Sequence, residues 1–408
     1  MSDPSGFGGG DFLRNMLSDL LRLLPTTGGM QWQLAHQLAT EIAGTGSDPN
    51  PDPLERIQLE QLTAIAELHV ADVTGMPTAP AGGSLSIVPS SRRQWARSTL
   101  EVWKPVLDRL AESLGPAAPG VPAPGGPPTA PGSDLDLAPD TGGEGDMGSL
   151  LGQWATAIFP MMTAMQVGSV VGHLAERALG PYEVPLAPVR SGELLVISRN
   201  LAQVAEDWSL PIDDLRLWIC VHELAYHTVM TRPAVAERMA ALVVQHAEQV
   251  RPDAAAISEL MQSADVNDPS ALMRIFADPA ALGSGTEDGP SAVRAELDAL
   301  TAAVAGYAEH VTGTVADRLI GQHAPIGEAM RRRRVGRGDG EKVAEALFGL
   351  CLDQALVDRG EKFVRGVLER SGDAWLARMW VGPETLPTPA EIDAPGLWLA
   401  RLELFEES

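Results

Sequence analysis

The sequence has little cysteine and no long apolar run. Only two of the 408 residues are cysteines, Cys220 and Cys351, and both have apolar neighbours. This predicts buried, reduced thiols in a cytoplasmic protein rather than a disulfide framework. No stretch of about 18 uninterrupted apolar residues occurs, so the sequence predicts no membrane span. The first residues, MSDPSGFGGGD, lack a basic region followed by an apolar run, so we also expect no secretory signal.

Positive charge is also scarce. The chain has 30 Lys and Arg against 54 Asp and Glu, which gives a formal net charge of -24. A chain with this charge is repelled by phosphate backbones and by anionic lipid, so we expect it to bind neither nucleic acid nor an anionic membrane nonspecifically. Aromatic residues make up only 5% of the sequence, but 45% of it is hydrophobic. That content is enough for a substantial core and argues against global disorder.

Motifs of several common enzyme classes are missing, namely a nucleotide-binding glycine loop, a Cys/His cluster and a nucleophile elbow. One stretch suggests chemistry: residues 215–230, LRLWICVHELAYHTVM. It starts like an H-E-x-x-H zinc helix, in which two histidines four residues apart reach one metal and the glutamate activates water. His222 and Glu223 fit this motif, but Tyr226 stands where the second histidine belongs. His227 is one residue further on, roughly 140° around the helix from His222.

Apolar periodicity predicts a mainly helical chain with little sheet. Short extended segments are expected at 85–88 and 192–198. Pro211 and the acidic residues that follow it favour a helix through His222 that ends at or before Pro233. In chain order we expect a flexible tail at 1–10, a helical N-terminal lobe at 11–114, a Pro/Gly-rich linker at 115–147, a core at 148–371 and a C-terminal segment at 372–408 packed on that core.

Three further segments stand out. The amphipathic stretch Asp11 to Leu24 and the 115–147 linker are the expected contact elements for a partner. Met330 to Glu341 reads as a basic, glycine-punctuated loop. Its four arginines, Arg331 to Arg334, could hold an anionic ligand, but in so acidic a chain we expect them to form intramolecular ion pairs.

A family resemblance rests on several stretches spread along the chain. They are MQWQLA from Met30, GELLVIS from Gly192, LRLWI with the following His222-Glu223, GYAEHV from Gly306, RGEKF from Arg359 and LPTPAEIDAPGLWLAR from Leu386. Together they resemble the bacterial zincin-like family of zinc-dependent metalloproteases or hydrolases, one branch of which is labelled as associated with deazaflavin coenzyme biosynthesis. The resemblance spans most of the chain apart from the linker. It implies a mainly α, zincin-like metallopeptidase fold with a helical N-terminal lobe and little β.

The resemblance also implies a set of site residues. It places the first zinc ligand at His222 and the general base at Glu223, and both are present. The second ligand, a histidine in the family, falls at Tyr226. The third, a glutamate, falls at Ala305, which has no donor atom. A catalytic zinc normally takes three protein ligands. We therefore expect no bound cofactor and regard Glu223 as a vestigial general base, since it has no zinc-bound water to deprotonate.

Three other residues could rebuild a metal site, namely His227, Glu309 and His310. Glu309 lies one turn beyond Ala305 on the same face, displaced by roughly 6 Å along the helix. That is far for a ligand of the same metal, and His310 is rotated off this face. We expect Tyr226 to fill the space of the lost metal, beside His222 or Glu223. His227, His246 and His323 are expected at the surface.

We therefore predict that the chain is a noncatalytic binding, scaffold or regulatory protein derived from a zincin-like metallopeptidase. Its expected partners are another protein or an intact paralogue, a peptide in the inherited cleft, or a second copy of the chain. The alternative is an active zinc-dependent metalloprotease or hydrolase with a nonstandard ligand set. A second alternative is a purely structural helical protein, in which His222 simply bonds to a neighbour on a buried helix face and Glu223 is solvated.

Overall fold

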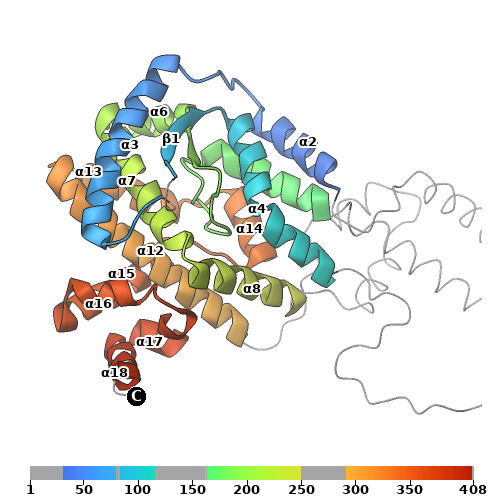
Figure 1. Ribbon diagram of the computed structural model, residues 1–408. Helices are drawn as coiled ribbons and strands as arrows, with labels where there is room; N and C mark the ends of the chain where they lie inside the picture. The colour runs from blue at the N-terminus through green and yellow to red at the C-terminus, as the bar shows by residue number, and fades with distance from the viewer. Residues whose placement is uncertain (1–30, 80–82, 115–160, 162, 250–290, 407–408) are drawn as a thin grey trace, which may run out of the picture.

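The structure is a computed structural model that describes residues 31–79, 83–114, 161, 163–249 and 291–406. This part of the chain is mainly helical and has little strand, as predicted (Figure 1). The N-terminal half contains α2 (Trp32–Ala43), α3 (Pro53–Thr74), β1 (Ser86–Ser90), α4 (Arg92–Leu114), a helix at 163–177, β2 (Glu193–Ile197), α6 (Ser198–Asp207), α7 (Ile212–Met230) and α8 (Pro233–Gln249). The C-terminal half contains α12 (Ala292–Leu319), α13 (Ala324–Val335), α14 (Asp339–Phe348), α15 (Gln354–Ser371), α16 (Asp373–Arg378), a short 3-10 turn (Pro383–Thr385), α17 (Pro389–Asp393) and α18 (Pro395–Glu406).

Local sequence signals explain where the main helices begin and end. The Asp52 side chain accepts a hydrogen bond of 2.9 Å from the Leu54 N–H, and Pro53 follows it in the first turn of α3. The helix ends at Gly75, whose φ of 64° is readily accessible to glycine. Pro211 precedes α7, and Asp213 and Asp214 place negative charge near its positive end. The predicted helix after Pro211 that ends before Pro233 is therefore confirmed.

The two strands join segments that are far apart in the sequence. β1 and β2 pair in parallel, with Ser86 opposite Glu193 and Ser90 opposite Ile197. α3 packs against β1, and α4 packs against β2. The strands thus connect the 31–114 segment directly to the part of the chain that carries His222.

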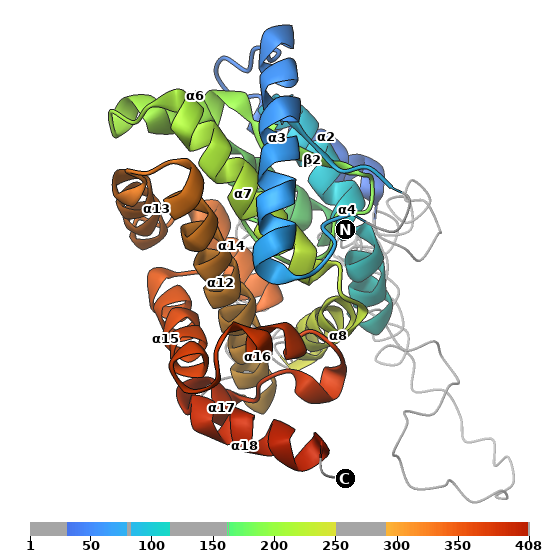
Figure 2. The same ribbon diagram turned by 60° about the vertical axis from the view of Figure 1, so that its left-hand side comes forward.

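Helices α7 and α12 lie at the centre of the molecule (Figure 2). α12 packs against α15, α7, α8 and α3. Gly306 on α12 faces Gly360 on α15 so closely that a Cβ atom on either glycine would overlap the backbone of the other helix. This close approach lies one residue from Ala305, so it fixes the position of that turn of α12.

One hydrophobic cluster extends from Ala35 to Leu402. Its largest fully buried side chains include Trp95, Trp103 and Trp398, so these tryptophans belong to the core. Cys220 and Cys351 are both buried and free, as predicted. Burial raises the pKa of the Cys220 thiol to about 12, so this thiol stays protonated near neutral pH.

The prediction of a loop from Met330 to Glu341 is wrong. Residues 330–335 continue α13, and 339–341 begin α14, so only the short Gly-Arg-Gly stretch between them is irregular. The reason is that arginine is a good helix former, and Glu328 pairs with both Arg331 and Arg332 at helical spacing. The stretch Asp11 to Leu24, the 115–147 linker and the loop expected at 263–290 lie outside the described residues.

The expected intramolecular pairing of the arginine run is confirmed. Arg333 pairs with Glu183 at 3.2 Å, and Arg334 pairs with Glu309. Two of the four arginines therefore point into the protein rather than into solvent. Within the described ranges, no helix is both long and apolar enough to span a bilayer.

Candidate functional site

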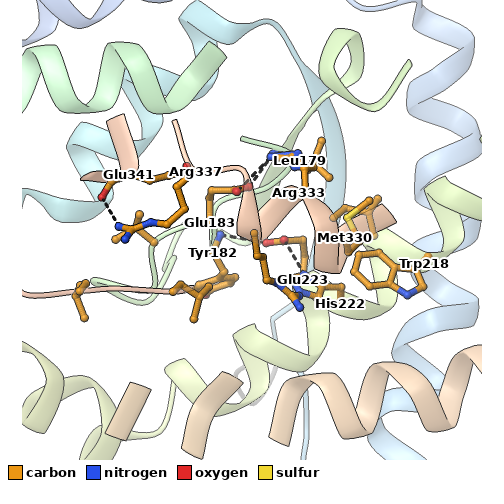
Figure 3. A pocket seen from close by; sticks show the side chains of 15 residues that line it. Leu179, Tyr182, Glu183, Trp218, His222, Glu223, Met330, Arg333, Arg337 and Glu341 are labelled. Atoms are coloured by element: carbon orange, nitrogen blue, oxygen red, sulfur yellow. Dashed lines mark hydrogen bonds and ion pairs between the residues drawn. The ribbon is translucent and has the colours of Figure 1, made fainter. Parts of the chain in front are cut away.

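The site is a small cavity beside the middle of α7. It has a volume of about 60 Å³ and is lined by residues from the 179–184 segment, α7, α13, α14 and the residues that follow α14 (Figure 3). His222 and Glu223 both lie at this cavity. A cavity of this size has room for a few water molecules, because a single water requires about 10–15 Å³.

Glu223 is held by backbone atoms of the 179–184 segment. Its side chain is only 2% exposed. Oε2 accepts a hydrogen bond of 3.2 Å from the Tyr182 N–H, and Oε1 lies 3.2 Å from Nδ1 of His222. A Cβ atom at Gly180 would overlap the Glu223 carboxylate, so this carboxylate could not keep its position beside a larger residue. This burial differs from the solvated Glu223 of the purely structural alternative.

His222 lies between two carboxylates. Its Nδ1 faces Glu223, and its Nε2 forms an ion pair of 3.7 Å with Oε1 of Glu309. The Trp218 ring stacks on the imidazole, with ring centroids 4.8 Å apart. Burial lowers the pKa of His222, but the hydrogen bonds and charges of Glu223 and Glu309 outweigh it and raise the pKa to about 9. The two carboxylates therefore favour the protonated imidazole over the neutral form that a metal ligand needs.

Glu309 reaches His222 although it lies a full turn beyond Ala305. Helical side chains lean toward the N-terminus of their own helix, so a glutamate one turn further on covers the surface next to position 305. The displacement along the helix, which counted against Glu309 in the sequence, is thus spanned by its side chain. Glu309 is the one residue of the three rescue candidates that the structure brings to His222.

Arg334 completes a row of charges with His222 and Glu309. Its guanidinium pairs with the same oxygen, Oε1, that faces His222. The side chains of Arg334 and Glu309 are only 14% and 15% exposed. Burial on its own would raise the pKa of Glu309, but Arg334 and His222 lower it to about 2. Glu309 is therefore ionised throughout the physiological range and lies between two cations.

Tyr226 fills the space next to His222. Its ring is fully buried, stacks on Tyr182 with centroids 6.0 Å apart, and lies 4.9 Å from the His222 ring. The ring of Tyr226 thus packs against His222. The hydroxyl has no hydrogen-bond partner among the described residues. Burial raises the Tyr226 pKa well above its ordinary value, so the phenol stays protonated and is a poor ligand.

His227 and His310 lie away from the His222 cluster. His227 is 2% exposed, and its Nδ1 lies 2.8 Å from the Tyr182 hydroxyl, which in turn accepts from the Val189 N–H. The Tyr182 hydroxyl can donate its proton to His227 in the tautomer that leaves Nδ1 without a hydrogen. Burial lowers the pKa of His227 to about 4, in agreement with a neutral acceptor. The pKa of the half-buried His310 is likewise lowered by burial, with an opposing contribution from Asp373.

The prediction that His227 and His246 lie at the surface is wrong. Both are buried, with 2% and 8% exposure. α7 is covered on all sides over its second half, and α8 packs against α4 and α12, so neighbouring helices cover both histidines. His323 remains partly exposed and contacts Asp317 at 2.8 Å.

Comparison with known proteins agrees with the resemblance inferred from the sequence. The family described as zincin-like metallopeptidase matches residues 30–399. The chain belongs to this family. A crystal structure from Chloroflexus aurantiacus, titled as a "putative hydrolase with a novel fold", superposes with a TM-score of 0.57 and 23% identity, covering 92% of this chain and 99% of the other. At that identity, the likeness concerns the fold alone. No curated protein matches the chain.

The donors in this zincin-like protein do not fit a three-ligand catalytic zinc site. Tyr226 has a phenol where the family has a histidine, and the fully buried Ala305 has no donor. Glu309 is bound by Arg334. Among the residues the structure describes, no group of three or more His, Cys, Asp or Glu side chains could hold a metal ion.

Sequence reasoning missed several residues of this zincin-like site. Tyr182, Gly180 and Glu183 lie about 30 residues before the start of α7 and carry no recognisable motif. The run of four arginines was recognised in the sequence. Its spacing did not show that Arg334, rather than another arginine of the run, pairs with Glu309 beside His222. Charge balance could have predicted a cationic partner for Glu309, because a glutamate on a buried helix face needs a cation.

Proposed function

We propose that this zincin-like chain is a noncatalytic binding or regulatory protein, and that side-chain cations have replaced the zinc of its inherited site. The observation that carries the proposal is the pairing of Arg334 with Glu309, whose Oε1 also lies 3.7 Å from Nε2 of His222. The two cations, His222 and Arg334, balance the two carboxylates, Glu223 and Glu309. A cluster that is neutral overall does not require a metal to neutralise it.

Zinc could bind here only if the ion pairs of His222 and Glu309 were broken. His222 would need to lose a proton that Glu223 and Glu309 stabilise, and Glu309 would have to release Arg334. Metal binding is weakened by competition with protons at its ligands. Moreover, Tyr226 and Ala305 offer no replacement for the two ligands that are missing. The local charges therefore favour the row of ion pairs over a bound zinc.

The shape of the cavity also opposes peptide cleavage. A general base must lie within hydrogen-bond reach of the water it activates, and that water must lie next to the scissile bond. Glu223 is almost completely buried, and the cavity beside it, of about 60 Å³, has room for a few water molecules. Met330, Arg333 and Arg334 of α13 line the cavity. We therefore assign binding to the outer surface of the protein rather than to this cavity.

One observation favours the alternative of an active hydrolase with a nonstandard ligand set. Glu309 lies 3.7 Å from His222, so two of the three ligands of a zinc site are near each other. For this alternative, Arg334 would have to leave Glu309 and a third ligand would have to be recruited. The two functions make opposite predictions for zinc-dependent activity.

Peptidase assays with and without Glu223→Gln separate these functions. On unfolded protein and mixed peptide substrates, we expect the same background rate for wild type and Glu223→Gln, with or without added zinc or a chelator. The conservative substitution keeps the shape of the side chain but removes the base, and a zinc enzyme would lose at least about a hundredfold in rate. Zinc-stimulated activity that Glu223→Gln abolishes would refute the proposal.

A further inference from the structure

Helix α3 carries four large apolar side chains that face solvent. Leu54, Ile57, Ile65 and Leu68 are 66%, 53%, 45% and 69% exposed. At 3.6 residues per turn, these residues and the exposed Gln61 fall within an arc of roughly 80°. The opposite side of α3 packs against α7, β1 and α12. Both views show α3 at the outside of the molecule, and in Figure 2 it runs down the front.

The order of residues along this stripe is symmetric. Read from Leu54 to Leu68, it is Leu, Ile, Gln, Ile, Leu, with spacings of three, four, four and three residues about Gln61. A twofold contact between identical chains requires a surface that matches itself when reversed. Two antiparallel copies of α3 would place Leu54 opposite Leu68, Ile57 opposite Ile65, and Gln61 opposite Gln61. An amide has both a donor and an acceptor, so the two glutamines can bond to each other.

The charges around the stripe also suit a second copy. None of the five residues in the stripe is charged, although the whole chain has a net charge of -24. Arg56 beside the stripe pairs with Glu60 at 3.0 Å and Glu193 at 3.2 Å, and Asp72 at its end pairs with Arg318 at 2.8 Å. These charges already have partners within the same chain. Close contact along the stripe therefore buries no unpaired charge.

We propose that α3 pairs antiparallel with α3 of a second copy of the chain, across a twofold axis at Gln61. A membrane suits the stripe less well, because a helix that lies on anionic lipid needs basic flanks and an uninterrupted apolar face. A glutamine in the middle of an apolar seam is instead a feature that fixes the register of paired helices. The contact is confined to one helix, so the dimer forms in a concentration-dependent way.

Cross-linking of single-cysteine variants tests the geometry. Gln61→Cys places two thiols next to each other at the twofold axis, so a short bis-maleimide should link two chains. The control, Leu54→Cys, should not link to itself, because two copies of position 54 would lie about 21 Å apart along antiparallel helices. A mixture of Leu54→Cys and Leu68→Cys should give linked dimers. The natural thiols, Cys220 and Cys351, are buried, which keeps the background low.

Sedimentation over a range of concentrations tests the association itself. Wild type should shift from monomer to dimer as its concentration rises, and Leu68→Glu should weaken the dimer at least about tenfold. Leu397→Glu, at a site that is 57% exposed on α18, is the matched control and should leave the dimer intact. A monomer at all concentrations, a dimer unaffected by Leu68→Glu, or linkage of Leu54→Cys to itself would overturn the proposal. The first two outcomes would direct attention to a different occupant of the stripe.

Discussion

Zinc binding should be gained when Tyr226→His, Ala305→Glu and Arg334→Met are combined. The first two substitutions supply the ligands that the zincin-like resemblance places at these positions. The third removes the guanidinium that holds Glu309 beside His222. With His222, this variant has three donors around one point, which is the number a catalytic zinc normally takes. We expect zinc to bind at least about a thousandfold more tightly than to wild type, equivalent to about 4 kcal/mol.

Competition with a chromogenic zinc chelator measures this affinity directly. Addition of His222→Ala to the triple variant is the matched control, and it should abolish the gain. The double variant Tyr226→His with Ala305→Glu should bind zinc less tightly than the triple variant, since Arg334 still repels a second cation. Triple-variant protein that folds normally but binds zinc no better than wild type would show that the ligand positions are not inherited in the proposed geometry.

Arg334→Met alone should destabilise the protein by about 3 kcal/mol at neutral pH, because removal of one partner leaves the other charge buried and unpaired. Methionine keeps much of the volume of the arginine stem, so the change is mainly one of charge. Adding Glu309→Gln should restore most of the lost stability. Urea denaturation of the two single variants, the double variant and wild type measures these differences and the coupling between the two residues.

The effect of Arg334→Met should also depend on pH in a defined direction. In wild type, the pKa of Glu309 is about 2, below its ordinary value. Its contribution to stability is therefore present above the ordinary carboxyl pKa and is lost as the pH falls through about 2. In the variant, Glu309 can be protonated without losing Arg334, so the destabilisation should shrink below about pH 4.5. A variant as stable as wild type at pH 7 would show that the ion pair has no structural role.

The sequence predicted the helical architecture well where the signals were local. The proline and acidic residues at the start of α7 and the apolar periodicity that predicted a mainly helical chain depend on neighbours within a few residues. The His222-Glu223 pair and the positions of Tyr226 and Ala305 were also recognised, because a motif and a family resemblance mark them. The arginine run was assigned to a loop because its glycines were given more weight than the helix propensity of four arginines.

The parts of the site that could not be predicted depend on contacts between distant segments. Tyr182 reaches both Glu223 and His227 from a segment with no regular pattern. The burial of His227 follows from helices that cover α7 on every side, which the periodicity of one helix does not reveal. The contact of Glu309 with His222 depends on side-chain direction and on the close packing of α7 and α12 rather than on spacing alone.

The central claim is that charged side chains have replaced zinc in this zincin-like protein. Elemental mass spectrometry of wild-type protein, purified without chelator or metal-affinity resin, tests it most directly. We predict zinc far below one atom per chain, and no change on His222→Ala. Near-stoichiometric zinc that is lost in His222→Ala would contradict the account.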